Sequence, residues 1–476
     1  INASFMSATR SMLGSTVFTG INRLSQFHEN PAVIAWWRAR MGRALNWLTP
    51  YRRRAILAVA AVCAGIIEPL DSLSKNEGLP LPSDGIGAAI VILALFGILY
   101  LTYRAAAGFV SLPTAVRRHP QLALHLFYWG FLLVLWNTAP TAGLWRAVLL
   151  GVAIIFPYLI WRCGYLLLSG QHGRIAGTSF ADHLIYLWPA YGGTETPYGK
   201  GLVYLSQHEA KTEEELARSQ LAGIKLFFLA VLWGSGLYLM EGIFYGGGNG
   251  LTRALGGNAN VVPALGQVIK QGTEAPLGAA WASVYCELIK QVLRHAASGH
   301  IIIGILRLFG FNVFRNTYKP LLAESIIEFW NRYFYYFKEL LVNFFFLPTF
   351  TGLGKKLKNW PHLRLFAAVF AAAFVGNVYY HVIKDSATVA EGDMYEVLFE
   401  LRARMFYCLL LASGIFVSML RQQRQRGQTM SIALAPRILR MFGVWTFFSL
   451  IFIWGVRSRA SFSIRMDFFL GLFGLA

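Results

Sequence analysis

Residues 86–103 have the sequence IGAAIVILALFGILYLTY, which contains no charged side chain. An α-helix needs about 20 mostly apolar residues to cross a bilayer, so this stretch predicts a transmembrane helix. Outward from it, the same criterion predicts further spans at 55–70, 121–138, 147–169, 222–245, 277–311 (two helices broken around 295–300), 326–347, 363–383, 396–419 and 438–456. The sequence therefore predicts an all-α, polytopic transmembrane bundle of about 10–12 membrane helices.

The composition agrees with the bilayer as the solvent of this chain. Of 476 residues, 56% are hydrophobic and only 14% are charged, which is too apolar for a soluble surface. The formal net charge is +20, but the basic residues gather between the apolar spans. Basic loops of this kind set topology and attract anionic lipid. We therefore expect membrane lipids, and not nucleic acid, as partners of the basic residues.

The hydropathy pattern divides the chain into three parts. Residues 1–50 form an amphipathic segment, cytoplasmic or interfacial, that lacks the apolar core of a signal peptide; 51–170 form an N-terminal transmembrane block; and 171–476 form the core. The stretch 207–218, QHEAKTEEELAR, predicts a short solvated helix. Under the positive-inside rule, loops rich in Lys and Arg face the cytoplasm. The basic residues that place their loops on the cytoplasmic side are Arg52, Arg53, Arg54, Arg117, Arg118, Arg162 and Arg174.

The cysteines do not suggest a disulfide framework or a zinc site. They lie in separate apolar stretches and form no CxxC pair, at Cys63, Cys163, Cys286 and Cys408. We expect no resident metal and no bound cofactor.

The stretch 297–333, ASGHIIIGILRLFGFNVFRNTYKPLLAESIIEFWNRY, resembles the bacterial branch of the membrane-bound O-acyltransferase family, which includes alginate O-acetylases and the D-alanyl transfer proteins of teichoic acid synthesis. The similarity runs through Gly304, Gly310, Phe311, Asn316, Pro320, Leu322, Ser325, Phe329, Trp330 and Arg332.

Three other stretches resemble family elements in the family's order. FVGNVYYHV at 374–382 is similar to the element that holds the family's histidine, through Gly376 and His381. Residues 180–199 match through Pro189, Gly193 and Pro197, and residues 446–475 match through Trp454, Arg459, Ala460 and Ser461. Together the four stretches cover roughly residues 180 to 476.

The resemblance implies an O-acyltransferase of the bacterial inner membrane. It would move an acyl group, acetyl as the leading choice, from a cytoplasmic acyl-coenzyme A or acyl-carrier thioester to a hydroxyl of a cell-envelope glycan. Other envelope-biosynthesis subunits would be candidate partners. His381 would act as the general base and Asn331 would orient a substrate. The substrate channel would be lined by Trp330, Arg332, Tyr333, His300 and Glu324. The donor entrance would be lined by Lys355, Lys356 and Lys358.

Each of these residues also has a structural interpretation. His300 fits a hydrogen bond between helices, the aromatic residues fit an interfacial belt, and the lysines fit a topology signal. Glu324 and Glu328, at i and i+4, could pair with a metal ion, but Arg332 four residues after Glu328 favours an ion pair.

One departure from the family pattern favours an alternative function. The bacterial family has a histidine after its WRRW motif, whereas this chain has Phe334. Asn331, three residues earlier, would be one helical turn away and could substitute for it. If it does not, the chain is a non-catalytic scaffold or assembly subunit on a degenerate acyltransferase fold. A transporter is a weaker alternative, because the sequence has no evident internal repeat.

The basic loops predict that position 213 faces the cytoplasm. A cysteine introduced there (Glu213→Cys), in a background without accessible native cysteine, should not react with a membrane-impermeant maleimide in intact cells. Permeabilised cells should give full labelling as the control. Labelling in intact cells would reverse the assigned topology.

Overall fold

The computed structural model describes residues 26–75, 81–82, 84–138, 143–187, 200–245, 262–271, 275–425, 433–456 and 460–475. These residues are almost all helical, and their only β-type pairing is one isolated bridge between Glu209 and Phe311. Seven of the described helical segments are long and apolar enough to cross a membrane. They are α4 (Pro50–Lys75), α5 (Gly85–Ala107), α8 (Leu144–Gln171), α11 (Glu213–Phe244), the segment Pro361–Lys384, α22 (Arg402–Arg424) and α23 (Leu434–Gly455). The chain is thus an all-α, multi-pass integral membrane protein.

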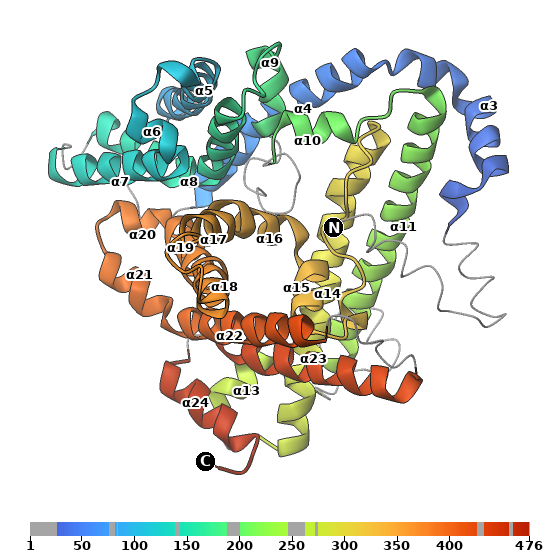
Figure 1. Ribbon diagram of the computed structural model, residues 1–476, viewed down its shortest axis with the longest axis vertical. Helices are drawn as coiled ribbons and strands as arrows, with labels where there is room; N and C mark the ends of the chain where they lie inside the picture. Colours follow the sequence, from blue (N-terminus) through green and yellow to red (C-terminus); the bar gives the residue numbers. More distant parts are fainter. Residues whose placement is uncertain are drawn as a thin grey trace.

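The N-terminal block is organised around α8, which lies with α5–α7 in the upper left of Figure 1. Of its most apolar window, 72% is buried inside the protein, against 28% for α4 and for α5, so α8 is the central helix. α5 and α7 (Pro120–Thr138) pack along it. Short elements complete the block: η2 (Phe109–Ser111), α6 (Thr114–Arg118), α9 (Phe180–His183), η3 (Leu184–Leu187) and α10 (Leu202–Gln207).

α11 and α14 (Leu277–Leu308) lie side by side at the right of Figure 1. Glycines allow the close approach: a Cβ added to Gly223 would lie 2.8 Å from the carbonyl oxygen of Gly304. Small residues serve this purpose at membrane helix contacts. The predicted break at 295–300 is wrong, because α14 continues through both histidines. His295 packs on Tyr333, and His300 contacts the carbonyl of Ala296 in its own helix, so neither side chain interrupts the helix.

The predicted short helix at 207–218 is also wrong. α10 ends at Gln207, and Glu213–Arg218 are the first turns of the long α11. Thr212 caps α11 by accepting a hydrogen bond from the backbone nitrogen of Glu215 (3.2 Å), and Glu215 completes the capping box.

The predicted single span at 326–347 is divided into four pieces: α15 (Ile326–Tyr333), α16 (Tyr335–Leu341), the π-helix η7 (Val342–Phe346) and α17 (Leu347–Gly352). α15 ends because Phe334 leaves the helical conformation, with φ −144° and ψ 69°. Asn331 therefore does not lie one helical turn from Phe334 on a common face, as the sequence had suggested.

The C-terminal elements surround these pieces. α18 (Pro361–Phe370), the π-helix η8 (Ala371–Gly376) and α19 (Asn377–Lys384) form one continuous rod, and α22 and α23 cross below it in Figure 1. The remaining elements are η1 (Phe27–Glu29), α3 (Pro31–Trp47), α13 (Leu265–Gln271), η6 (Pro320–Leu322), α20 (Ser386–Ala390), α21 (Met394–Glu400) and α24 (Phe462–Gly471).

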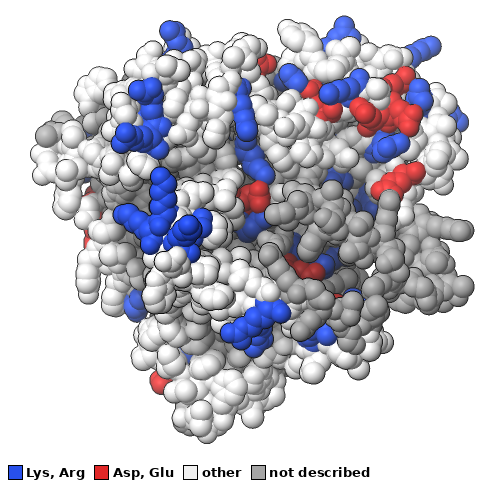
Figure 2. Space-filling model, viewed as in Figure 1, with Lys and Arg blue, Asp and Glu red and all other residues white. Residues whose placement is uncertain are grey.

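Charge is unevenly distributed on the face drawn in Figure 2. Lys and Arg recur across it, whereas Asp and Glu gather mainly at the upper right, over the start of α11 with its Glu213, Glu214 and Glu215. Beside this start, α3 packs on α11 through Ile34 and Leu45, and the Trp37 indole donates a hydrogen bond to Gln220 (2.9 Å).

Glu324 ties the start of α15 to α23. Its carboxylate accepts hydrogen bonds from Arg437 Nε (2.8 Å) and Arg440 Nε (2.9 Å). Burial raises the pKa of the Glu324 carboxyl, but the bonds from the two arginines lower it by more, so the net pKa lies below its ordinary value. A depressed carboxyl pKa stabilises the fold above the unfolded-state pKa, and this contribution is lost as the pH falls through the folded-state pKa.

Glu324→Gln should therefore destabilise the purified protein at pH 7, by about 1–3 kcal/mol, because a charge-assisted bond of both arginines is lost. The difference in thermal unfolding midpoint from wild type should shrink as the pH falls below about 4. Glu391→Gln, at an exposed carboxylate, is the matched control. An unchanged midpoint at pH 7 would contradict this tie.

Candidate functional site

Two π-helical turns meet beside the predicted histidine. η7 directly follows α16, η8 directly precedes the helix of His381, and the two segments pack against each other. Gly376 makes this packing possible, because a Cβ there would lie 2.6 Å from the ring of Phe345. π-Helical turns are rare and are frequent at functional sites. The stretch that holds His381 is thus in direct contact with the helix that continues the chain 9 to 13 residues after Tyr333.

A row of aromatic rings joins His381 to a second histidine. Tyr380 lies edge-on to His381 (ring centroids 5.6 Å apart) and packs on Phe337 (4.9 Å), and Phe337 packs on Phe334 (5.4 Å). Phe334 in turn lies 4.9 Å from the ring of His295 on α14. Both histidine side chains are half-buried. We call these five residues the aromatic row; it is the candidate site.

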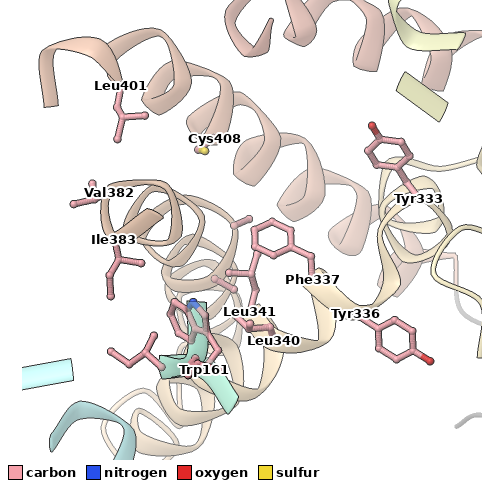
Figure 3. Close-up of a cluster of buried hydrophobic side chains, with 14 of the residues drawn as sticks. Trp161, Tyr333, Tyr336, Phe337, Leu340, Leu341, Val382, Ile383, Leu401 and Cys408 are labelled. Atoms are coloured by element: carbon pink, nitrogen blue, oxygen red, sulfur yellow. The ribbon is translucent and has the colours of Figure 1, made fainter. Parts of the chain in front are cut away.

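Figure 3 shows the buried packing behind the aromatic row. Phe337, Leu340 and Leu341 of α16 point toward Trp161 of α8, while Tyr336 points the opposite way. Val382 and Ile383, next to His381, lie on the far side of the same cluster, with Leu401 and Cys408 above them. Val382 and Ile383, which directly follow His381, are buried in this cluster and anchor that side of α19.

A polar bond also fixes the orientation of α19. The hydroxyl of Tyr379 lies 2.8 Å from Nδ1 of His125 on α7 and accepts a hydrogen bond from the Trp129 indole (3.0 Å). His125 packs on Trp161 (ring centroids 4.7 Å apart). Tyr379 is two residues from His381 on the same helix. Its bonds hold one face of α19 against the N-terminal block, and this fixes the rotation of the helix about its axis.

The helix break at Phe334 is supported by the chain segment 314–318. The backbone nitrogen of Tyr335 donates to the carbonyl oxygen of Asn316 (2.9 Å), and that of Tyr318 donates to the carbonyl of Arg332 (2.7 Å). The Thr317 hydroxyl donates to the Tyr333 carbonyl (2.9 Å). These bonds fix the aromatic row without a continuous helix.

Some of the predicted channel residues lie next to the aromatic row. Trp330 is buried and packs on Phe337 (6.3 Å), and Tyr333 is buried and lies 5.3 Å from the ring of His295. Asn331 is half-buried on the same short helix α15. Arg332 pairs with Glu328, so the predicted i, i+4 ion pair is confirmed.

Other predicted residues lie elsewhere. Glu324 precedes α15 and is held by α23, so it does not share a helix face with Glu328 as expected; its backbone nitrogen instead donates to that carboxylate (2.7 Å). His300 is buried on α14, where its Nδ1 contacts the carbonyl of Ala296. The predicted basic loop between α17 and α18 is exposed, with Lys355, Lys356 and Lys358. Among the described residues, no group of three or more His, Cys, Asp and Glu side chains is placed to hold a metal ion.

Two further predictions fall outside the described residues. They are the similarity through Pro189, Gly193 and Pro197, and the position of Arg459 in the C-terminal stretch.

His295 was the site residue that the sequence reasoning did not select. Its apolar neighbourhood was recognisable, but its contact with Phe334 joins two helices about 40 residues apart and has no local sequence signal. Two facts of the sequence together could have pointed to His295. The family's histidine is absent at position 334, and another histidine lies within the apolar stretch 277–311.

A separate cavity of about 330 Å³ lies near the N-terminal block. It is bounded by α4, α9, η3 and α10, and none of the predicted site residues lines it. Arg54 and Asp182 are its charged lining residues.

The comparisons with known proteins add no family to these observations. No protein-family model matches the chain, and no curated protein matches it at a significant level. The likeness to membrane-bound O-acyltransferases therefore rests on the four sequence stretches.

Gly376→Ala should disturb the contact between the π-helical turns, since the added methyl group meets Phe345. Overpacking of this kind costs about 1–3 kcal/mol, so we expect a lower thermal unfolding midpoint. Gly234→Ala, where a Cβ meets nothing within 4 Å, is the matched control. In a double-mutant cycle, Phe345→Leu should recover part of the loss; strictly additive effects would contradict direct contact.

Proposed function

We propose that the chain is a membrane-bound O-acyltransferase of the bacterial inner membrane. It moves an acyl group, acetyl as the first choice, from a cytoplasmic thioester donor to a hydroxyl of a cell-envelope glycan. The observation that supports this most is the aromatic row, because it leads through ring contacts from His381 to Phe334, the residue that directly follows the FWNRY segment. A second imidazole, His295, stands against Phe334, where the family has its other histidine.

The proposed chemistry needs one base and a leaving thiol. His381 takes the proton of the acceptor hydroxyl while the oxygen attacks the thioester carbonyl carbon. The tetrahedral intermediate collapses, the carbon–sulfur bond breaks, and the thiolate leaves and takes up a proton. Imidazole suits this role because its ordinary pKa is close to neutral. Asn331 and His295 are the candidate groups that orient the acceptor or the donor.

The exposed lysines of the loop between α17 and α18 are suited to the donor. Lys355, Lys356 and Lys358 have no carboxylate within ion-pair distance among the described residues. Their charge would raise the local concentration of a phosphate-bearing thioester such as coenzyme A.

Phe334 supports a second candidate, the scaffold on a degenerate acyltransferase fold. The Phe334 ring packs against the rings of His295, Tyr333 and Phe337. An apolar side chain therefore occupies the place where the family has a histidine. The two proposals differ in whether His381 and His295 are needed for a reaction.

Replacing each histidine with glutamine distinguishes them, because glutamine keeps a polar side chain but cannot act as a base near neutral pH. His381→Gln should reduce envelope-glycan acylation about 10²- to 10⁴-fold with unchanged protein level, and His295→Gln should reduce it less. His362→Gln, an exposed histidine at the start of α18, is the matched control and should behave as wild type.

Phe334→His should change activity much less than His381→Gln, since the proposed enzyme works without histidine at 334. Glycan acylation equal to wild type in His381→Gln cells, at normal protein level, would reject catalysis by this residue and favour the scaffold.

A further inference from the structure

The cavity between α4, α9, η3 and α10 has a wall that is apolar in one part and charged in another. These elements meet at the top of Figure 1. The volume of about 330 Å³ lies at the lower end of the range for ligand pockets. The apolar part of the wall includes Leu57, Ala58, Ile185, Leu202 and Phe311, and the charged part consists of Arg54 and Asp182.

The order of these residues along α4 places the cavity at the boundary of the membrane. Arg54 ends the basic run 51–54, and the uncharged, apolar run 55–67 follows it directly. The last basic residues before a membrane span lie at the level of the lipid headgroups, and Tyr51, which is 81% exposed, suits the same level. Leu57 and Ala58 lie one turn further into the span. The cavity therefore runs from the headgroups toward the hydrocarbon region.

Arg54 is held in place and keeps one nitrogen for a ligand. Its Nε donates to both carboxylate oxygens of Glu209 (3.2 and 3.1 Å), and its Nη2 donates to the same carboxylate. Glu209 is in turn fixed by its backbone bridge to Phe311, which lines the cavity. The Arg54 Nη1 has no hydrogen-bond partner among the described residues. A guanidinium group fixed in this way is suited to a phosphate oxygen.

Asp182 offers the opposite charge to the same cavity. Its Oδ2 accepts hydrogen bonds from the backbone nitrogen and the hydroxyl of Ser179 (2.8 and 2.9 Å) at the start of α9. Its Oδ1 has no such partner in the part of the chain that the structure describes. A carboxylate oxygen accepts from an ammonium group. The cavity thus has a place for an anion, a place for an amine and an apolar wall.

We propose that this cavity binds a membrane phospholipid with a zwitterionic, primary-amine headgroup. The phosphate accepts from Arg54, the ammonium group donates to Asp182, and one acyl chain lies along Leu57, Ala58 and Ile185. A single molecule then satisfies both charges and covers the apolar wall. The site does not rest on the proposed acyl transfer, because none of these residues belongs to the aromatic row.

Lipid titration of the full chain, purified in detergent and freed of lipid, tests the site. The probes are phosphatidylethanolamine, phosphatidylcholine and phosphatidylglycerol with the same acyl chains, and the readouts are the thermal unfolding midpoint and the lipid retained in native mass spectrometry. Phosphatidylethanolamine should bind about tenfold more tightly than the others, because phosphatidylcholine has no N–H to donate and phosphatidylglycerol has no cation. Equal affinities for phosphatidylethanolamine and phosphatidylcholine, or tighter binding of phosphatidylglycerol, would overturn the proposal.

Two variants assign the binding to this cavity. Ala58→Phe adds a ring at the apolar wall and should abolish most of the phosphatidylethanolamine binding, whereas Ala60→Phe, at an exposed position of the same helix, should match wild type. Asp182→Asn should lower the affinity for phosphatidylethanolamine about tenfold, to that of phosphatidylcholine, and Asp467→Asn, at an exposed carboxylate of α24, is its control. If Asp182→Asn does not fold, Ala58→Phe decides. A preference for phosphatidylethanolamine that survives in Ala58→Phe places the lipid elsewhere and rejects the site.

Discussion

A broken helix inside a membrane protein is possible only where the freed backbone groups find new partners, and the break at Phe334 depends on this condition. The segment 314–318 supplies the partners on both sides of the break. Its residues donate to the carbonyls of Arg332 and Tyr333 and accept from the backbone of Tyr335 and Tyr336. Without that segment, α15 and α16 would have to form one continuous helix. Phe334 would then no longer point along the row toward His295 and Tyr380.

The same condition explains the two π-helical turns. A π-helical turn widens the helix by one residue but keeps its backbone bonds within the chain, so it is tolerated where an open loop is not. The turn in η8 shifts the register of α19 relative to α18, and η7 does the same after α16. Their contact at Gly376 then fixes two helices that each carry a shifted register. The direction of His381 is a product of this contact, and of the bond of Tyr379 to His125 on its other side.

Features that depend on near neighbours in sequence could be predicted. The long apolar runs predicted helices α4, α5 and α8 to within about five residues at each end, and the end but not the start of α11. The i, i+4 spacing predicted the Glu328–Arg332 pair. Features that depend on distant partners could not. The polar residues of α14 suggested a break, but α11 packs along it and the helix stays continuous. An apolar run at 326–347 suggested one span, but the hydrogen bonds from 314–318 divide it.

The segment 314–318 also ties the end of α14 to the helix break. Arg307, in the last turn of α14, donates hydrogen bonds to the carbonyl of Val313 through Nε and Nη2 (3.3 and 2.8 Å). The next residue, Phe314, accepts a hydrogen bond at its carbonyl from the Tyr336 hydroxyl (2.7 Å). The end of α14 and the start of α16 are therefore bonded to the same short stretch of chain. Because His295 lies on α14 and Phe334 lies at the break, this stretch sets the distance between the two ends of their contact, and the aromatic row depends on backbone bonds that none of its own members makes.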